Sequence, residues 1–234
     1  TCALCRNVSG TNNTAVGICA LDAHQSGNSN TAIGSYSLAA NTTAEQNVAV
    51  GSNTLQANTT GANNVAVGRN ALGANTTGTE NVAMGTEALD SNTTGNYNTG
   101  VGFQSLQAVT TGGYNTGVGY KTLFTNTGSL NTAVGWSALL SNTSASNNVA
   151  VGTNSSEKTT TGDQNVSVGV DSLNKNTTGT ENTALGRFAL CANTTASNNT
   201  AVGKAALQSN STGTRNTAVG KDALKVNTTG NENA

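Results

Sequence analysis

A repeat of 17 residues runs through the chain, and a chain of this kind folds by stacking each repeat on the next. The repeat reads N-T/V-A-V-G-x-x-A-L-x-x-N-T-T-G-x-x, and its first Asn opens thirteen full coils over residues 13–232. Residues 1–12 fit positions 6 to 17 of a preceding partial coil, and residues 233–234 begin the next one. One coil, 115–130, has 16 residues. The periodicity predicts a single solenoid domain over residues 1–234, without a separate cap.

The fixed positions of the repeat predict an all-β fold. Positions are numbered 1 to 17 from the first Asn, and a column is the set of residues that share one position in successive coils. Positions 2 to 4 alternate as in a strand, with positions 2 and 4 on one face and the small residue of position 3 on the other. We expect the apolar columns at positions 4 and 9 to meet inside the coil as its core. With 9% charged and 3% aromatic residues that core is thin, so the sequence predicts a parallel β-solenoid of about thirteen 17-residue coils.

Three further positions predict local backbone geometry. Glycine stands at position 5 in all thirteen coils, which indicates a positive φ or a tight approach to the neighbouring coil. Positions 6 to 11 surround one Leu with small side chains, and we expect a short second strand there in preference to a helical turn. Asn-Thr-Thr-Gly at positions 12 to 15 is typical of a turn that closes the coil, since Asn and Gly both tolerate left-handed conformations.

Stacking is obligatory for such a repeat. One coil buries only about two or three apolar side chains, against an ordering cost of about 1 to 2 kcal/mol per residue. With about 4.8 Å between coils, the stack would be a rod on the order of 60 Å long. We expect the Asn at position 1 to form an amide ladder between coils; the alternative is a simple turn residue. The ladder would comprise Asn13, Asn30, Asn47, Asn64, Asn81, Asn98, Asn115, Asn131, Asn148, Asn165, Asn182, Asn199 and Asn216.

A second Asn column, at position 12, carries most of the Asn-x-Ser/Thr sequons. In a cell that performs N-glycosylation, this row would be a track of glycans on an exposed turn. The alternative is that N-T-T-G is only a turn or an internal ladder. The candidate glycosylation sites are Asn41, Asn58, Asn75, Asn92, Asn142, Asn176, Asn193, Asn210 and Asn227.

The four cysteines predict one disulfide. Cys2 and Cys19 share position 7 in adjacent coils, so their Cα atoms should lie about 4.8 Å apart, within the range of a Cys2–Cys19 bridge. Cys2, Cys5, Cys19 and His24 also reach the ligand number of a structural zinc, which is the alternative. Cys5 and Cys191 share position 10 but lie eleven coils apart, so they cannot pair within one rod. A disulfide favours an oxidising compartment, hence an extracellular or cell-surface location.

The remaining residues give no pattern for catalysis or for a cofactor. His24 is the only histidine, and the eleven acidic residues recur in no pair that would tune one pKa against another. The glycines form neither a phosphate-binding loop nor a calcium-binding nonapeptide. A net charge of −1 with scattered basic residues argues against a nucleic-acid partner, and no apolar run approaches the roughly 18 residues of a membrane span. We therefore expect no enzyme activity, no cofactor, no metal and no membrane insertion.

The motif N-T-A-V-G-x-x-A-L, at residues 13–21, 131–139 and 216–224, resembles the head repeats of YadA-like trimeric autotransporter adhesins and similar repeats in phage-type tail fibres. The resemblance spans essentially the whole chain, although the repeat here is longer, with its additional residues in the N-T-T-G segment. It implies a parallel β-roll, often trimeric, that displays a surface for attachment to host matrix or cells.

Two functions are consistent with these features. The first is a structural subunit or segment of an extracellular fibril or surface appendage, glycosylated along its Asn row. It would assemble head to tail, because a following copy would continue the register with only positions 3 to 5 missing; the alternative is that these residues are part of a longer solenoid. The second is a trimeric adhesin head or tail-fibre shaft, in which the small residues of position 3 pack between chains. A minor alternative is an ice-binding solenoid, which needs a regular Thr array, whereas position 2 mixes Thr and Val. The first residues of the position 3 column are Ala15, Ala32, Ala49, Ala66 and Ala83.

Overall fold

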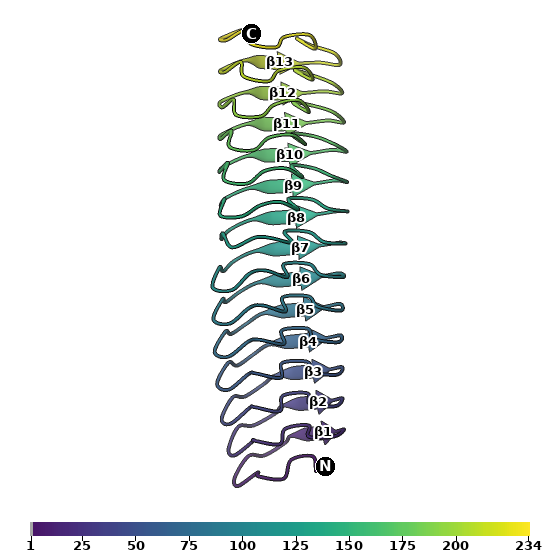
Figure 1. The fold of residues 1–234 in the computed structure, drawn as a ribbon, viewed down its shortest axis with the longest axis vertical. Helices are drawn as coiled ribbons and strands as arrows, with labels where there is room; N and C mark the ends of the chain where they lie inside the picture. The colour runs from purple at the N-terminus through teal and green to yellow at the C-terminus, as the bar shows by residue number, and fades with distance from the viewer. Residues whose placement is uncertain (1) are drawn as a thin grey trace. The chain divides into compact units, whose positions relative to one another are not determined.

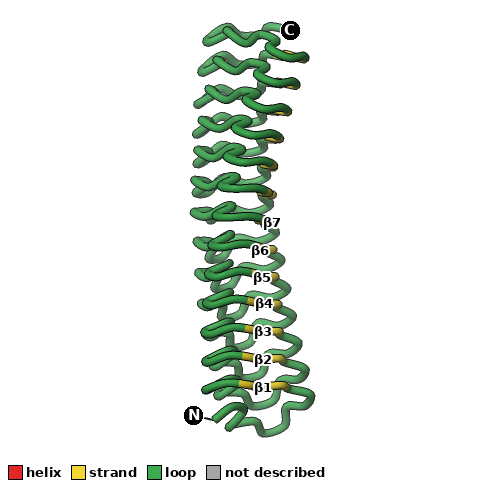
Figure 2. The backbone as a smooth tube through the Cα atoms, turned by 90° about the vertical axis from the view of Figure 1, so that its right-hand side faces the viewer, coloured by secondary structure: helices red, strands yellow, loops and turns green. Residues whose placement is uncertain are grey.

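The structure is a computed structural model that describes residues 2–234. The chain forms two compact units, Thr1–Asn115 and Thr116–Ala234. Each unit is a parallel β-solenoid in which every full coil contributes one strand of three residues, and residues 2–234 contain no helix (Figures 1 and 2). The predicted fold class is confirmed.

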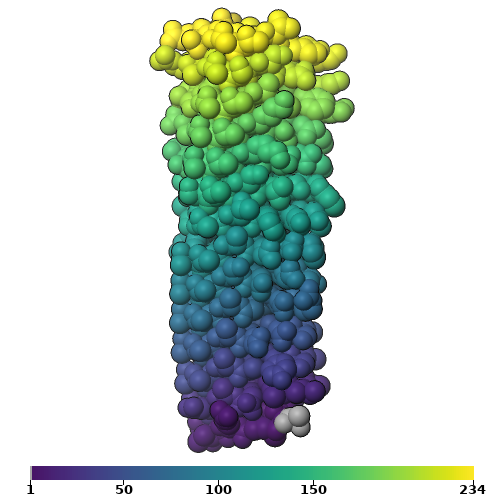
Figure 3. Space-filling view, in the orientation of Figure 1, coloured from purple at the N-terminus to yellow at the C-terminus, as the bar shows by residue number. Residues whose placement is uncertain are grey.

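The strands follow one another at the spacing of the repeat, and in the space-filling view the coils of each unit form successive layers of colour (Figure 3). The first unit contains β1 (Thr14–Val16), β2 (Thr31–Ile33), β3 (Val48–Val50), β4 (Val65–Val67), β5 (Val82–Met84) and β6 (Thr99–Val101). The second unit contains β7 (Thr116–Val118), β8 (Thr132–Val134), β9 (Val149–Val151), β10 (Val166–Val168), β11 (Thr183–Leu185), β12 (Thr200–Val202) and β13 (Thr217–Val219).

Within each unit, neighbouring strands pair residues that occupy the same position of the repeat. Ala15 of β1 lies opposite Ala32 of β2, and the other pairs of the first unit repeat this pattern. In the second unit β7 and β8 keep the same register, although the coil between them is one residue short. The closing turn absorbs the deletion, because the Asn126 side chain donates to the carbonyl of Gly128, two residues on, where other coils span three.

The core of each coil lies between the position 3 column and the Leu column at position 9. Ala32 and Leu38 are fully buried, whereas Ile33 at position 4 is 41% exposed. The prediction for position 9 is confirmed, and that for position 4 is wrong. The reason is the Asn of position 1, whose side chain turns inward to bond the neighbouring coil, so that strand alternation places position 3 inside as well. The space is narrow, since a Cβ added to Gly100 at position 3 would lie 3.3 Å from Cγ of Leu89.

Positions 5 to 11 form consecutive turns, so the expected second strand is wrong. Positions 5, 7 and 9 have positive φ, as in Gly51 (136°), Asn53 (56°) and Leu55 (50°). Alternate residues with positive φ interrupt the extended geometry that a strand requires. A left-handed Leu costs about 1 to 2 kcal/mol. Complete burial of Leu55 offsets this, since a buried Leu side chain contributes about 1.5 to 3 kcal/mol.

Glycine at position 5 meets both conditions that its recurrence indicated. Gly51 has a φ of 136°, and a Cβ there would lie 2.7 Å from the carbonyl oxygen of Gly68 in the next coil. In the closing turn the left-handed residue is at position 17, for example Asn63 with a φ of 59°, and not the Asn of position 12 or the Gly of position 15. The position 5 glycine therefore combines a backbone requirement with a steric one.

Candidate functional surfaces

The Asn column at position 1 forms an amide ladder of the expected kind. The backbone N–H and the side-chain amide of Asn64 both donate to Oδ1 of Asn47, at 3.0 and 3.2 Å. The same side-chain amide donates to the carbonyl of Gly78 at 2.8 Å, which joins the start of the coil to its closing turn. The column is buried from Asn30 to Asn216. Its amides therefore hold the coils together and present nothing to a ligand.

The Asn column at position 12 is a second internal ladder, so the predicted row of glycosylation sites is wrong. Nδ2 of Asn75 donates to Oδ1 of Asn58 at 2.8 Å and to the carbonyl of Gly78 at 3.0 Å. An N-linked glycan would be attached at this buried nitrogen. Asn227 is half-buried and makes the same two bonds. The other eight candidates are fully buried: Asn41, Asn58, Asn75, Asn92, Asn142, Asn176, Asn193 and Asn210.

The Thr that follows this Asn also has a structural role. The hydroxyl of Thr59 at position 13 donates to the carbonyl of Thr76 in the next coil at 3.0 Å, and the same bond recurs from Thr76 to Thr93. Two hydrogen-bonded columns thus account for the Asn-Thr pair at the start of the sequon. The sequence alone could not separate this meaning from a glycosylation signal.

In each unit the outward side of the strands is an uncharged surface that we call the valine face of that unit, defined as positions 2 and 4 of its coils. No charged residue occurs at either position in the thirteen coils. The expectation that position 3 forms an outer contact surface is wrong, because Ala32 and its equivalents lie in the core. The inward-pointing Asn of position 1 is the signal that could have located the valine face from the sequence. Its exposed large apolar side chains are Val16, Ile33, Val67, Met84, Val118, Val149, Val168 and Val219.

Aromatic side chains stand just outside both ends of the strands, in columns 17 and 6. In the first unit Tyr97 and Tyr114 stack with centroids 4.9 Å apart, and in the second unit Tyr120 and Trp136 stack at 4.0 Å. Tyr114 is 61% exposed and Trp136 56% exposed. In each pair the stacking covers one face of each ring. These contacts between rings of adjacent coils therefore reinforce the stacking of the coils.

Charged groups form small local networks without a shared centre. In the first unit Arg69 Nη2 and Gln104 Nε2 donate to the Glu87 carboxylate at 2.8 and 2.7 Å. Burial, and then the charge of Glu87, raise the pKa of Asp90 above its usual value, while Arg69 acts in the opposite direction. In the second unit a hydrogen bond from Lys225 holds the pKa of the exposed Asp222 below its usual value. None of these groups faces a cleft where a substrate could be held.

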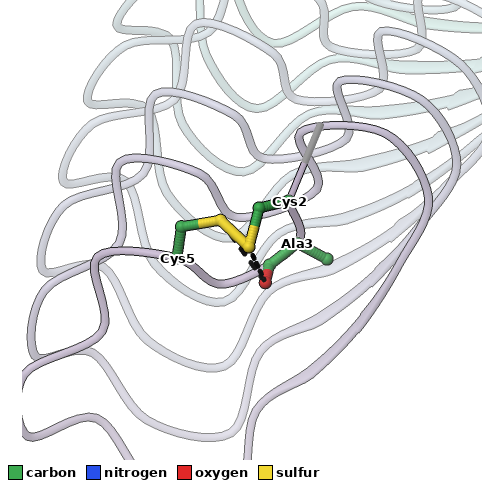
Figure 4. The surroundings of a disulfide bond; sticks show 3 residues. All are labelled: Cys2, Ala3 and Cys5. Atoms are coloured by element: carbon green, nitrogen blue, oxygen red, sulfur yellow. Dashed lines mark hydrogen bonds between the residues drawn. A yellow bond between two sulfur atoms is a disulfide. The ribbon is translucent and has the colours of Figure 1, made fainter.

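The disulfide joins Cys2 to Cys5, with Cα atoms 5.7 Å apart, so the predicted Cys2–Cys19 bridge is wrong (Figure 4). A short turn brings Cys5 back beside Cys2 within the partial coil, a contact that column spacing does not anticipate. Cys19 and Cys191 are half-buried free thiols. The disulfide leaves Cys2 and Cys5 without thiolates for zinc. His24 is fully buried with Nε2 2.8 Å from the carbonyl of Gly27, where it takes the place of Asn in column 12.

Neither unit contains a pocket among its described residues. Within residues 2–234, no three His, Cys, Asp or Glu side chains are grouped closely enough to bind a metal ion. The same part of the chain has no helix of the length and apolarity needed to cross a membrane. The inward columns are occupied by hydrogen bonds and packing, so what the molecule offers to others is its outer surface.

No family model, curated protein or solved structure matches this chain.

Proposed function

We propose that this protein is a structural, self-associating solenoid of an extracellular fibril or surface appendage, with no catalytic role. The observation that carries the proposal is the valine face. Every strand presents only apolar and Thr side chains there, and none of them is charged. Contiguous exposed apolar surfaces in soluble proteins are typical of interaction sites. A side chain such as Val67, 37% exposed, gains on the order of 0.5 to 1 kcal/mol when it is covered, and the gain repeats in each coil.

The spacing of the valine face favours a second copy of the chain as its partner. Its side chains recur at the distance between coils, about 4.8 Å. A partner that covers several rows must present side chains at the same interval. A copy of this chain does so because it has the same repeat. Side-by-side packing of valine faces also brings no like charges together, since positions 2 and 4 are uncharged. The chain would thus supply length and stiffness, with attachment through its own repeat.

The extracellular location rests on the Cys2–Cys5 disulfide, because disulfides persist mainly in oxidising compartments. A low proportion of charged side chains and interiors built from amide ladders suit a durable scaffold more than a reaction centre. Glycans on the position 12 row form no part of this proposal.

The second candidate is the trimeric adhesin head or tail-fibre shaft, and the same valine face supports it. In a closed three-chain bundle, positions 2 and 4 of each chain would meet at the centre, in place of the position 3 residues that lie in the core. The two candidates differ in assembly: a closed bundle has one size, whereas a fibril grows with concentration.

Light scattering after size-exclusion chromatography tests the proposal. We expect the wild-type chain of 23.2 kDa to form multimers. Val67→Glu with Val168→Glu places one charge on the valine face of each unit and should shift the protein to monomers. The matched control, Thr60→Glu with Thr161→Glu, carries the same charge at exposed position 14 and should leave the multimers intact. A monomeric wild type at every concentration refutes the proposal; a fixed three-chain mass selects the adhesin or tail-fibre form, and an open series selects the fibril.

A further inference from the structure

Three of the four cysteines lie in the first two turns of the first unit. The N–H of Leu4 donates to the carbonyl of Ala20 at 2.9 Å, the bond that joins position 9 to position 8 of the following coil elsewhere, as from Leu38 to Thr54 at 3.0 Å. Residues 2–12 therefore stack on the coil 13–29 in the regular register. This places Cys2 and Cys19 in the same column, at position 7 of adjacent coils.

Side chains of column 7 in adjacent coils are close enough to bond one another, as three pairs show. Asn53 Nδ2 lies 3.3 Å from Asn70 Oδ1, and Gln104 Nε2 lies 2.7 Å from Glu87 Oε2. In the second unit Asn154 Nδ2 lies 3.2 Å from Asp171 Oδ1. The distance between coils, about 4.8 Å, is also within the Cα range of disulfides. A thiol at Cys19 is thus placed in the column of a sulfur atom that already belongs to the Cys2–Cys5 bridge.

We propose that Cys2, Cys5 and Cys19 form a thiol–disulfide exchange site. The Cys19 thiol loses its proton to solvent, and its thiolate attacks Sγ of Cys2. The Cys2–Cys19 bond forms as the Cys2–Cys5 bond breaks, and Cys5 leaves as a thiolate that takes up a proton. The number of disulfides is unchanged, so the step needs no oxidant or reductant.

The exchange moves the disulfide from within one turn to between two coils. The Cys2–Cys5 bridge closes a loop inside the partial coil, whereas a Cys2–Cys19 bridge ties that coil to the next and constrains a longer loop of the unfolded chain. It also exchanges one free thiol for another, because half-buried Cys19 becomes bonded and exposed Cys5 becomes free. The reactive group of the site is then a surface thiol. This inference is independent of the valine face and of the proposed function.

Peptide mapping distinguishes the two bridges without altering the protein. Arg6 separates Cys5 from Cys19, so trypsin places Cys2 and Cys5 in peptide 1–6 and Cys19 in peptide 7–69. After equilibration of the folded chain with reduced and oxidised glutathione, free thiols are alkylated and the digest is analysed by mass spectrometry. We expect two species: peptide 1–6 with its internal bridge, and peptide 1–6 joined to 7–69 with an alkylated Cys5. Cys191 has neighbours Asn174 and Gln208 in its own column and serves as an internal reference thiol.

Two matched variants make the outcome decisive. In Cys5→Ser, Cys2 and Cys19 remain in one column and should form a bridge that joins the two peptides. In Cys2→Ser, Cys5 and Cys19 stand in different columns and both should be alkylated. The proposal is overturned if Cys2 and Cys19 are both alkylated in Cys5→Ser while circular dichroism and thermal unfolding match the wild type. It is also overturned if the wild type yields the internal bridge alone under glutathione.

Discussion

Coil 64–80 of the first unit and coil 148–164 of the second unit have the same backbone but different interiors. At position 9 the first has Leu72 and the second has Ser156, and both side chains are buried. Their φ angles are 51° and 50°, and both donate their N–H to position 8 of the following coil, at 3.0 and 2.9 Å. The left-handed conformation thus persists without the leucine. The ladder of backbone hydrogen bonds between coils fixes it, and the leucine contributes burial.

The interior of the second coil is polar where the first is apolar. Ser156 Oγ lies 2.7 Å from Ser167 Oγ, and Ser155 Oγ lies 2.7 Å from Ser167 Oγ and 3.0 Å from Ser172 Oγ. A neutral hydrogen bond contributes about 0.5 to 1.5 kcal/mol, less than the burial of a Leu side chain. Ser156 makes only one of these bonds, so it replaces only part of the stabilisation that a leucine gives at position 9, and this coil should be the weaker of the two.

The largest effect on stability should come from giving coil 64–80, the regular coil, the serine that coil 148–164, the irregular coil, has at position 9. Leu72→Ser removes a fully buried side chain and leaves a hydroxyl among apolar neighbours, without the serine partners of the other coil. We expect the free energy of unfolding to fall by about 3 to 5 kcal/mol, measured by urea titration with circular dichroism. Val226→Ser, at a side chain that is 85% exposed, should change it by less than about 0.5 kcal/mol. A loss below about 1 kcal/mol for Leu72→Ser would mean that the leucine column is not the main source of burial.

The reverse substitution should have a smaller effect of opposite sign. Ser156→Leu restores the leucine column, while Ser167 keeps Ser155 as a partner. We expect the free energy of unfolding to rise by about 1 to 2 kcal/mol. Differential scanning calorimetry of the full chain measures the change in transition temperature. A lower transition temperature would show that the interior at this coil has closed around the serines and cannot accept the larger side chain.

The repeat period was sufficient to predict the fold class, because a 17-residue repeat with one alternating segment can bury its side chains only by stacking. The same period could not decide which strand residues point inward. That depended on Asn47 and its equivalents, whose amides can satisfy one another inside the coil as readily as they can face water. With the Asn of position 1 pointing inward, position 3 joins the core and positions 2 and 4 form the valine face.

Two local features could not be read from residue types. A leucine such as Leu55 has no preference for a φ of 50°, and only the hydrogen bonds of the neighbouring coils impose it. Cys2 had two geometrically acceptable partners, one along the column and one along the chain, and spacing alone does not choose between them. Asn58 likewise satisfies both a sequon and an internal ladder, and its burial decides for the ladder.

The position 12 ladder offers a third comparison, because it has a break within the first unit. Oδ1 of Asn75 accepts from Asn92, but Oδ1 of Asn92 is buried without a partner, since the next residue of the column is Val109. Val109→Asn supplies the missing donor and gives up the burial of the valine methyl groups. Pairing the buried oxygen removes a cost of about 1 to 3 kcal/mol, and a second bond to the closing turn, like that of Asn75 to Gly78, adds to it. We therefore expect the free energy of unfolding to rise by about 1 kcal/mol. Val226→Asn, at an exposed position, is the control and should have no measurable effect in the same urea titration. An unchanged or lower stability for Val109→Asn would indicate that a packed valine is worth as much at this site as one completed amide pair.

The smallest effect on stability concerns the acidic residue at position 10. Asp90 of coil 81–97 and Glu157 of coil 148–164 occupy this position in different surroundings. Glu157 of the irregular coil accepts from Asn174 and Lys158, at 3.1 and 2.6 Å, whereas burial and the charge of Glu87 raise the pKa of Asp90. An acid with a raised pKa binds its proton more tightly in the folded chain. Its ionised form therefore opposes folding above the folded pKa, and this cost is lost as the pH falls below the unfolded value.

Asp90→Asn should consequently stabilise the protein at neutral pH and not in acid. We expect a gain below about 0.5 kcal/mol at pH 7, which disappears near pH 3, in urea titrations at both pH values. Glu157→Gln, which loses an ion pair and keeps its position, should give no gain at pH 7. Equal gains for Asp90→Asn at the two pH values would show that the effect comes from packing of the amide. A gain that persists after the acid has lost its charge cannot come from removal of that charge.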